Sequence, residues 1–162
     1  VRAIVNAGTL TIEIEGRVRT EASVRFHATV RSLRALTTEG SGNTQIVKLR
    51  GESLDLVVGG SGSLAARSID IKRLTVRADG SGDIKLAGNV DEQRIELSGS
   101  GDYEASQLAS HSARVVVAGA GSAALHVTAD LDAVITGSGD ITYAGRPRIR
   151  KRVEGAGSIE PR

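Results

Sequence analysis

The triplet Gly-Ser/Ala-Gly recurs along this chain at a nearly constant interval. Its first glycine stands at positions 40, 60, 80, 99, 119, 137 and 155, so the intervals are 20, 20, 19, 20, 18 and 18 residues. Self-similarity at a fixed period of this length is typical of solenoids and other repeat architectures. An irregular β-sandwich has no such fixed repeat. The triplet therefore constrains the fold more than any other feature of the sequence.

Apolar residues occupy fixed positions around each triplet. Counted from the first glycine, positions −4, −2, +4 and +6 are mostly aliphatic, and the residues between them are mostly polar. Two of these columns read Leu36, Leu56, Val76, Ile95, Val115, Ala133, Lys151 and Thr44, Leu64, Ile84, Tyr103, Ala123, Ile141, Ile159. A period of two with many β-branched residues predicts strands with one buried face.

The repeat predicts an all-β fold, a single-stranded parallel β-helix with coils of 18–20 residues, as one domain over residues 1–162. Equivalent residues would stack ~4.8 Å apart, and each coil needs its neighbours to bury its apolar face. The first 39 residues are interpreted as two weaker coils, with strands in "TLTIEIEG" (Thr9–Gly16) and "SVRFHATVRSL" (Ser23–Leu33).

The triplet glycines are assigned to a tight turn. Glycine tolerates positive φ, and at these inward positions we expect a Cβ to collide with the opposite wall of the coil. The structural turn residues are Gly40, Gly42, Gly60, Gly62, Gly80, Gly82, Gly99, Gly101, Gly119, Gly121, Gly137, Gly139, Gly155 and Gly157.

Composition limits the functional classes. The chain has no cysteine, which excludes disulfides and thiolate metal sites, and aromatic residues make up only 2%. The net charge is +2, and no long basic run of the kind used on nucleic acids is present. The segment "RPRIRKR" (Arg146–Arg152) is interpreted as a solvated terminal rung, with a local anion patch as the alternative. No apolar run is long enough for a membrane-spanning helix.

Asp83, Asp102 and Asp140 follow three of the triplets and are the candidate binding residues, as outward carboxylates. Asp83 and Asp102 should lie on adjacent coils, with Lys85 and Glu104 able to pair beside them. The varied residue at this position, aspartate, serine or asparagine, argues against a regular calcium ladder. His27, His111 and His126 lack metal-ligand spacing and are expected at the surface. No metal site, no catalytic residue and no cofactor are predicted.

Several segments together resemble one bacterial family. "GSGDIKLAG", "LSGSGDYEAS", "ITGSGDITYAGRP" and "VEGAGSIEP" are similar to the "putative auto-transporter adhesin, head GIN domain" family. The resemblance implies a right-handed parallel β-helix, exported to the periplasm or cell surface, and it supplies no catalytic residues. The family pattern places another coil before a segment like "GTLTIEI" (Gly8–Ile14), so the chain is expected to lack its native N-terminal coil and export signal.

The leading functional hypothesis is a non-enzymatic cell-envelope protein that binds through its surface or associates with itself. Its expected partners are a second copy, a cell-surface glycan or a protein. One alternative is a β-helix that binds or cleaves polysaccharides at the Asp83 and Asp102 side. A second is a polymer-forming cytoskeletal β-helix, although Lys151 and Pro161 favour a blunted C-terminal end.

Overall fold

The computed structural model describes residues 2–13 and 24–162. The chain divides into two compact units, Val1–Val30 and Arg31–Arg162. The grouping of residues 1–162 into one domain stays a prediction.

The first unit contains an antiparallel hairpin of β1 (Arg2–Asn6) and β2 (Thr9–Glu13). Ala7 and Gly8 form its two-residue turn, with φ of 46° and 81°. Positive φ at both turn residues matches the twist of a tight hairpin. The prediction that Thr9–Gly16 belongs to a coil is therefore wrong for its described part, because the strand pairs backward across this turn. Residues 14–16 lie outside the described residues.

The second predicted early coil, Ser23–Leu33, is also wrong over its described part. Residues 24–33 form no strand, and Val24, Phe26 and Val30 are exposed. Alternation gives a strand its burial only where a neighbouring strand pairs with it. Ser23 itself lies outside the described residues.

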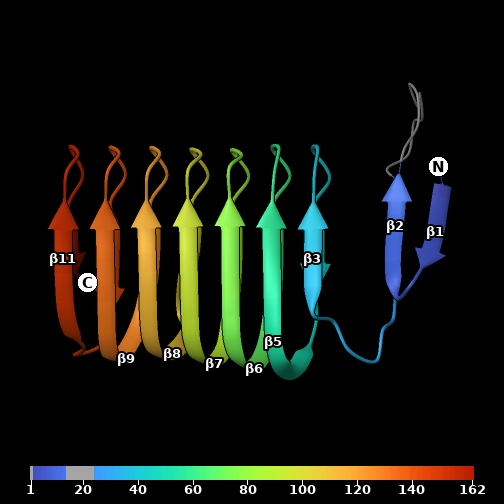
Figure 1. Ribbon diagram of the computed structural model, residues 1–162, viewed down its shortest axis with the longest axis horizontal. Helices are drawn as coiled ribbons and strands as arrows, with labels where there is room; N and C mark the ends of the chain where they lie inside the picture. Colours follow the sequence, from blue (N-terminus) through green and yellow to red (C-terminus); the bar gives the residue numbers. More distant parts are fainter. Residues whose placement is uncertain (1, 14–23) are drawn as a thin grey trace. The chain divides into compact units, whose positions relative to one another are not determined.

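The second unit is a parallel β-solenoid, as the repeat predicted. Its ten strands are β3 (Ala35–Thr38), β4 (Thr44–Ile46), β5 (Leu49–Val58), β6 (Leu64–Ala78), β7 (Ile84–Leu97), β8 (Tyr103–Val117), β9 (Ala123–Ile135), β10 (Ile141–Ala144), β11 (Arg148–Val153) and β12 (Ile159–Pro161). Figure 1 shows β3, β5 to β9 and β11 side by side, with the glycine turns projecting from one end of the strands.

Strand registers confirm the predicted coil length. Val76 pairs with Ile95 and Ile95 with Val115, while Ile141 pairs with Ile159. These partners stand 19, 20 and 18 positions apart in the sequence. Side chains at equivalent positions of successive coils thus stack directly on one another.

Each long strand bends and so forms more than one wall of its coil. In β6 the buried residues are Leu64, Ala66, Ile69, Ile71, Leu74, Val76 and Ala78. The alternation slips by one residue at Ser68 and again at Lys72–Arg73, where two consecutive side chains face outward. The strand therefore turns two corners while its apolar residues keep facing the interior.

The predicted apolar columns do line the interior. Leu56, Val76, Ile95 and Val115 are at most 1% exposed. A further inward column, which the triplet alignment did not include, lies before them in each coil and reads Leu54, Leu74, Gln93, Ala113 and Leu131. Its Gln93 is fully buried among aliphatic neighbours.

From Gly60 onward the triplet glycines are required by coil-to-coil contact, whereas a Cβ at Gly40 or Gly42 would meet nothing within 4 Å. A Cβ built on Gly82 would lie 2.0 Å from the carbonyl oxygen of Gly62, and one on Gly62 would lie 2.1 Å from that of Gly42. The expectation of a collision with the opposite wall is therefore wrong. The obstacle is the backbone of the preceding turn, directly along the stacking direction. Within the triplets, positive φ is confined to Gly40 and Gly60.

From Ser61 onward, the middle residue of each triplet joins its turn to the preceding one through its backbone N–H. Ser81 N–H donates to the Gly60 carbonyl at 2.8 Å, and Ala120 N–H donates to that of Gly99 at 3.1 Å. The bond needs no hydroxyl, which explains why alanine replaces serine at positions 120 and 156.

The C-terminal end of the solenoid carries polar groups that interrupt the interior columns. Lys151 stands where other coils place an aliphatic residue, and its Nζ donates to the Ile159 carbonyl at 2.8 Å. That nitrogen also lies 5.4 Å from the centroid of the half-buried Tyr143 ring. Pro161, in register with Tyr143, has no N–H to offer. Arg148, Arg150 and Arg152 are exposed on β11, the terminal rung expected from the sequence.

Candidate ligand-binding surface

The three candidate carboxylates form part of a column at the glycine turns. Asp83 and Asp102 lie on adjacent coils, and the Asp102 N–H donates to Asp83 Oδ1 at 3.1 Å. Asp102 Oδ1 accepts the Ser122 N–H at 2.8 Å, and Asp140 Oδ1 accepts the Ser158 N–H at 2.7 Å. Each carboxylate thus receives a hydrogen bond from the next coil. Their assignment as binding residues stays a prediction.

Asparagine performs the same task in an earlier coil. Asn43 Oδ1 accepts the Ser63 N–H at 3.0 Å, in the position that Asp83 occupies two coils later. An amide oxygen therefore satisfies the turn as a carboxylate oxygen does. This contact uses the oxygen as an acceptor and does not require the charge.

Lys85 and Glu104 are register partners on β7 and β8. Among the ion pairs of the described residues, none joins these two side chains. The Glu104 carboxylate instead accepts hydrogen bonds from the backbone N–H and the hydroxyl of Ser106. The side chain is held along its own strand.

Opposite charges pair between adjacent coils on the outer wall that β5 to β9 and β11 form. Arg77 Nε lies 3.4 Å from Glu96 Oε2, Arg114 Nη1 lies 2.6 Å from Asp132 Oδ2, and Arg148 Nε lies 3.1 Å from Asp130 Oδ1. Exposed pairs of this kind contribute only ~0–1 kcal/mol each. The pairs place charged side chains in rows along this outer wall.

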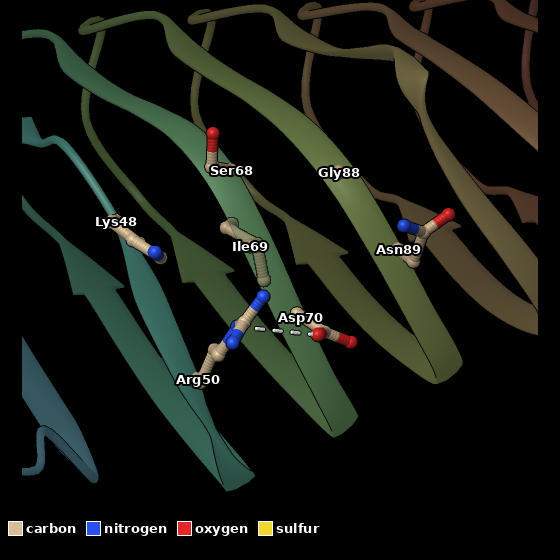
Figure 2. Close-up of a pocket in the computed structure, with 7 residues that line it drawn as sticks. All are labelled: Lys48, Arg50, Ser68, Ile69, Asp70, Gly88 and Asn89. Atoms are coloured by element: carbon tan, nitrogen blue, oxygen red, sulfur yellow. Dashed lines mark ion pairs between the residues drawn. The ribbon is translucent and has the colours of Figure 1, made fainter.

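A hollow of about 270 Å³ lies on the outside of three successive coils (Figure 2). Lys48 directly precedes β5 and Arg50 lies on it. Ser68 and Asp70 lie on β6, and Asn89 lies on β7. Ile69 and Gly88 complete the lining. All the polar side chains are exposed, so the hollow is open to solvent.

Irregular backbone produces this hollow. Ser68 has a φ of 75°, the only positive φ at a non-glycine residue among residues 31–162. The pairing of β6 with β7 shifts between Arg67 and Ile69, so Ser68 is an extra, unpaired residue. Gly88, in register with Ile69, has a φ of 135°. A Cβ there would lie 2.1 Å from the Ile69 carbonyl oxygen, so this position requires glycine.

The charges in the hollow are partly compensated. Arg50 Nε lies 3.5 Å from Asp70 Oδ2, and both side chains are more than half exposed. Lys48 is in none of the ion pairs between described residues. Two cations and one carboxylate leave one net positive charge at the hollow.

A buried hydrogen-bond network crosses the interior of the solenoid near β8. The Tyr103 hydroxyl donates to Gln93 Oε1 at 2.9 Å, and Gln93 Nε2 donates to Ser110 Oγ at 2.8 Å. The Ser110 hydroxyl in turn donates to the His126 carbonyl at 2.8 Å. Burial raises the pKa of the Tyr103 hydroxyl well above its usual range. This series of hydrogen bonds ends on the His126 backbone carbonyl, so every polar side chain in the network has a partner.

The sequence interpretation did not select the hollow or the network. Gly88 was the one available signal, because a lone glycine within a strand indicates a bulge. His27 and His111 are exposed and His126 is half-buried. The described residues contain no group of histidine, aspartate and glutamate side chains arranged to hold a metal ion. Nor does their structure include a helix that could cross a membrane.

Comparison with known proteins places the chain in a described family and beside several solved bacterial structures. The family described as "putative auto-transporter adhesin, head GIN domain" matches residues 1–147. A solved structure of a "putative adhesin" from Bacteroides fragilis is 25% identical with a TM-score of 0.87, over 99% of this chain and 76% of that one. No functionally curated protein matches the chain.

Two Parabacteroides structures are also similar. A "putative lipid binding protein" from Parabacteroides distasonis is 28% identical with a TM-score of 0.69, over 80% of this chain and 62% of that one. A "putative adhesin" from Parabacteroides merdae is 30% identical with a TM-score of 0.66, over 78% and 57%. The chain therefore spans less than two thirds of the length of either protein.

Proposed function

The chain belongs to the auto-transporter adhesin head GIN domain family, and on that premise we propose that it is a non-enzymatic, adhesion-like binding protein of the cell envelope. The observation that carries the proposal is the outer surface of the solenoid. Its charged side chains stand in fixed rows across successive coils, and its polar hollow is open to solvent.

The scaffold supports this role because it orders the backbone from which the outer side chains project before a partner arrives. Strands β5 to β9 pair in parallel along nearly their whole length, over a core of aliphatic residues. Binding costs less when the binding groups are already ordered. A flat stacked wall suits contact with an extended partner, such as a cell-surface glycan or protein.

The arrangement of the carboxylates at the turns supports polysaccharide cleavage less well than it supports binding without cleavage. A glycoside hydrolase places two carboxyl groups across a groove, about 5–10 Å apart, with the substrate between them. Asp83 and Asp102 instead lie in one column and accept backbone N–H groups from the following coil. Both have a structural task that accounts for their position.

The C-terminal end gives less support to an end-to-end polymer. Edge strands resist pairing with other chains when they carry inward charges or proline. Lys151 and Pro161 supply both features at this end. Self-association through other surfaces stays a prediction, which light scattering of the purified chain at high concentration tests.

Binding without turnover is the decisive test. The purified chain is applied to a glycan array and to isolated bacterial cell envelopes, and a reducing-sugar assay is run on every glycan that binds. We expect retention on envelopes and no new reducing ends. Release of reducing ends by the wild-type chain, abolished in Asp102→Asn, would establish an enzyme instead. Absence of binding to every envelope and glycan would overturn the adhesive role.

The family also supports placement in the periplasm or at the cell surface. Fractionation of cells that express the full-length native gene, with protease added to intact cells, tests that placement. Recovery in the cytosolic fraction would contradict it.

A further inference from the structure

We propose that the hollow formed by Lys48, Arg50, Ser68, Asp70 and Asn89 binds a hexuronate residue of an acidic polysaccharide. This inference rests on the proposed binding function and names the ligand of that surface. Lys48 and Arg50 bind the carboxylate, Ser68 and Asn89 bind sugar hydroxyls, and Asp70 positions Arg50.

The cations lie on one side of the hollow. Figure 2 shows Lys48 and Arg50 extending from the same strand segment toward Ile69, with Asn89 across from them on β7. The ion pair with Asp70 uses Arg50 Nε, which leaves the terminal guanidinium nitrogens for a ligand. Charge-assisted hydrogen bonds to a carboxylate are about twice as strong as neutral ones.

The net charge selects a singly charged ligand. The hollow holds two cations and one carboxylate, so a single negative group neutralises it. The remaining polar groups, a hydroxyl, a carboxamide and one carboxylate oxygen, are the donors and acceptors that sugar hydroxyls need. A hexuronate combines one carboxylate with several hydroxyls, and therefore matches the whole set.

Ser68 is the observation that separates this hollow from ordinary exposed polar surface. A non-glycine residue in a left-handed conformation costs ~1–3 kcal/mol, and such residues cluster at functional sites. Gly88 and Gly145 also have positive φ, but a Cβ there would meet the carbonyl oxygen of Ile69 at 2.1 Å or of Val127 at 2.0 Å, so both positions require glycine for lack of space as well. Position 68 instead carries a hydroxyl at the rim of the hollow despite the cost of its left-handed conformation.

The size of the hollow agrees with one sugar residue of a longer chain. Its volume of about 270 Å³ lies just below the ~300–1,000 Å³ typical of small-molecule sites. Because the hollow is open along the outer surface, a polymer can continue past it in both directions. Affinity for a single residue should be weak, and repetition along the polymer should strengthen it.

The test compares polygalacturonate oligosaccharides with galactan oligosaccharides of equal length, by isothermal titration calorimetry at low salt. Wild type should bind the former and not the latter. The variant Lys48→Gln/Arg50→Gln should bind at least about tenfold more weakly. Lys85→Gln/Arg150→Gln is the matched control. It removes the same two charges from exposed positions outside the hollow, and should bind within about twofold of wild type.

Two further measurements separate a specific site from general attraction. Ser68→Gly fits the local backbone and should keep the melting temperature while weakening binding severalfold. Poly-glutamate supplies carboxylates without sugar hydroxyls, and should bind much more weakly than polygalacturonate.

Each contrary result has a distinct meaning. Equal weakening in the two double variants, or equal binding of poly-glutamate, would overturn the hexuronate site. So would full polygalacturonate affinity in Lys48→Gln/Arg50→Gln, or no affinity in wild type. In all these cases, envelope binding by wild type would leave the proposed function standing. Loss of envelope binding itself would end both.

Discussion

The Tyr103 hydroxyl donates a hydrogen bond to Gln93 Oε1 at 2.9 Å, inside a core that is otherwise almost wholly aliphatic. The two residues lie on successive coils, and Gln93 continues the contact to Ser110. A buried polar group left without its partner costs ~1–3 kcal/mol. The hydrogen bond therefore stabilises one register between these coils relative to any register that would leave either group unpaired.

Removal of both partners should destabilise the chain by less than the two single removals added together. Tyr103→Phe and Gln93→Leu should each lower the free energy of unfolding by ~1–3 kcal/mol, because each leaves a buried polar group unpaired. The double variant should lose less than the sum of the two. Denaturant unfolding of all four proteins measures the coupling energy. Strict additivity would show that the bond contributes nothing specific.

Alkaline pH should destabilise the fold through Tyr103. Burial raises the pKa of this hydroxyl in the folded chain above its ordinary value of 10.0. Above about pH 10 the unfolded chain therefore loses a proton that the folded chain keeps, and stability falls by ~1.4 kcal/mol per pH unit. Melting temperatures from pH 8 to 11 should fall more steeply for wild type than for Tyr103→Phe. Parallel slopes would contradict the assignment.

Side chains at the triplet glycines should disrupt the stack. Gly82→Val should lower stability by more than ~3 kcal/mol, because its Cβ would meet the Gly62 carbonyl oxygen at 2.0 Å and backbone cannot move aside cheaply. Gly51→Ala is the matched control, since a Cβ there meets nothing within 4 Å. Thermal unfolding of both checks the contrast. A melting temperature unchanged in Gly82→Val would refute the stacking geometry.

The turn carboxylates should be replaceable by amides. Asp102→Asn keeps an oxygen for the Ser122 N–H and should unfold within ~0.5 kcal/mol of wild type. Asp102→Ala removes the acceptor and should cost ~1 kcal/mol. A large loss in the asparagine variant would mean that the charge itself matters, and would return Asp83, Asp102 and Asp140 to consideration as a binding column.

An aliphatic residue at position 151 should make the C-terminal end associative. Lys151→Val extends an interior column to the last rung and removes the inward charge that guards the edge. Light scattering should then detect concentration-dependent oligomers that wild type does not form. Identical monomeric behaviour in both proteins would show that Pro161 and the arginine rung suffice.

The periodic part of the fold was predictable because its cause repeats. Each glycine triplet and each aliphatic column is required again in every coil, so the pattern rises above local variation. The reason for the glycines was not predictable, since the sequence does not tell whether a Cβ would meet the opposite wall or the neighbouring turn. Only the observed alignment of Gly82 on Gly62 decides that.

The N-terminal hairpin and the hollow escaped prediction for different reasons. Alternation in Thr9–Glu13 fits a coil and a hairpin equally well, and the decisive signal was the Ala7–Gly8 turn. The hollow depends on the backbone at Ser68, a residue type that gives no hint of positive φ. Lys48 and Arg50 are ordinary exposed cations until the bulge arranges them around a depression.

The glycine turns also bear on how such a molecule changes over evolutionary time. The triplet glycines lie mainly against main-chain atoms of the turn before, and the middle residue donates its N–H to a main-chain carbonyl there, so one winding fits on another with little dependence on which winding it is. Duplication or loss of a segment of 18–20 residues would keep every junction intact and alter the length by ~4.8 Å. The length of the solenoid could thus be adjusted in uniform steps, independently of the side chains on its exterior.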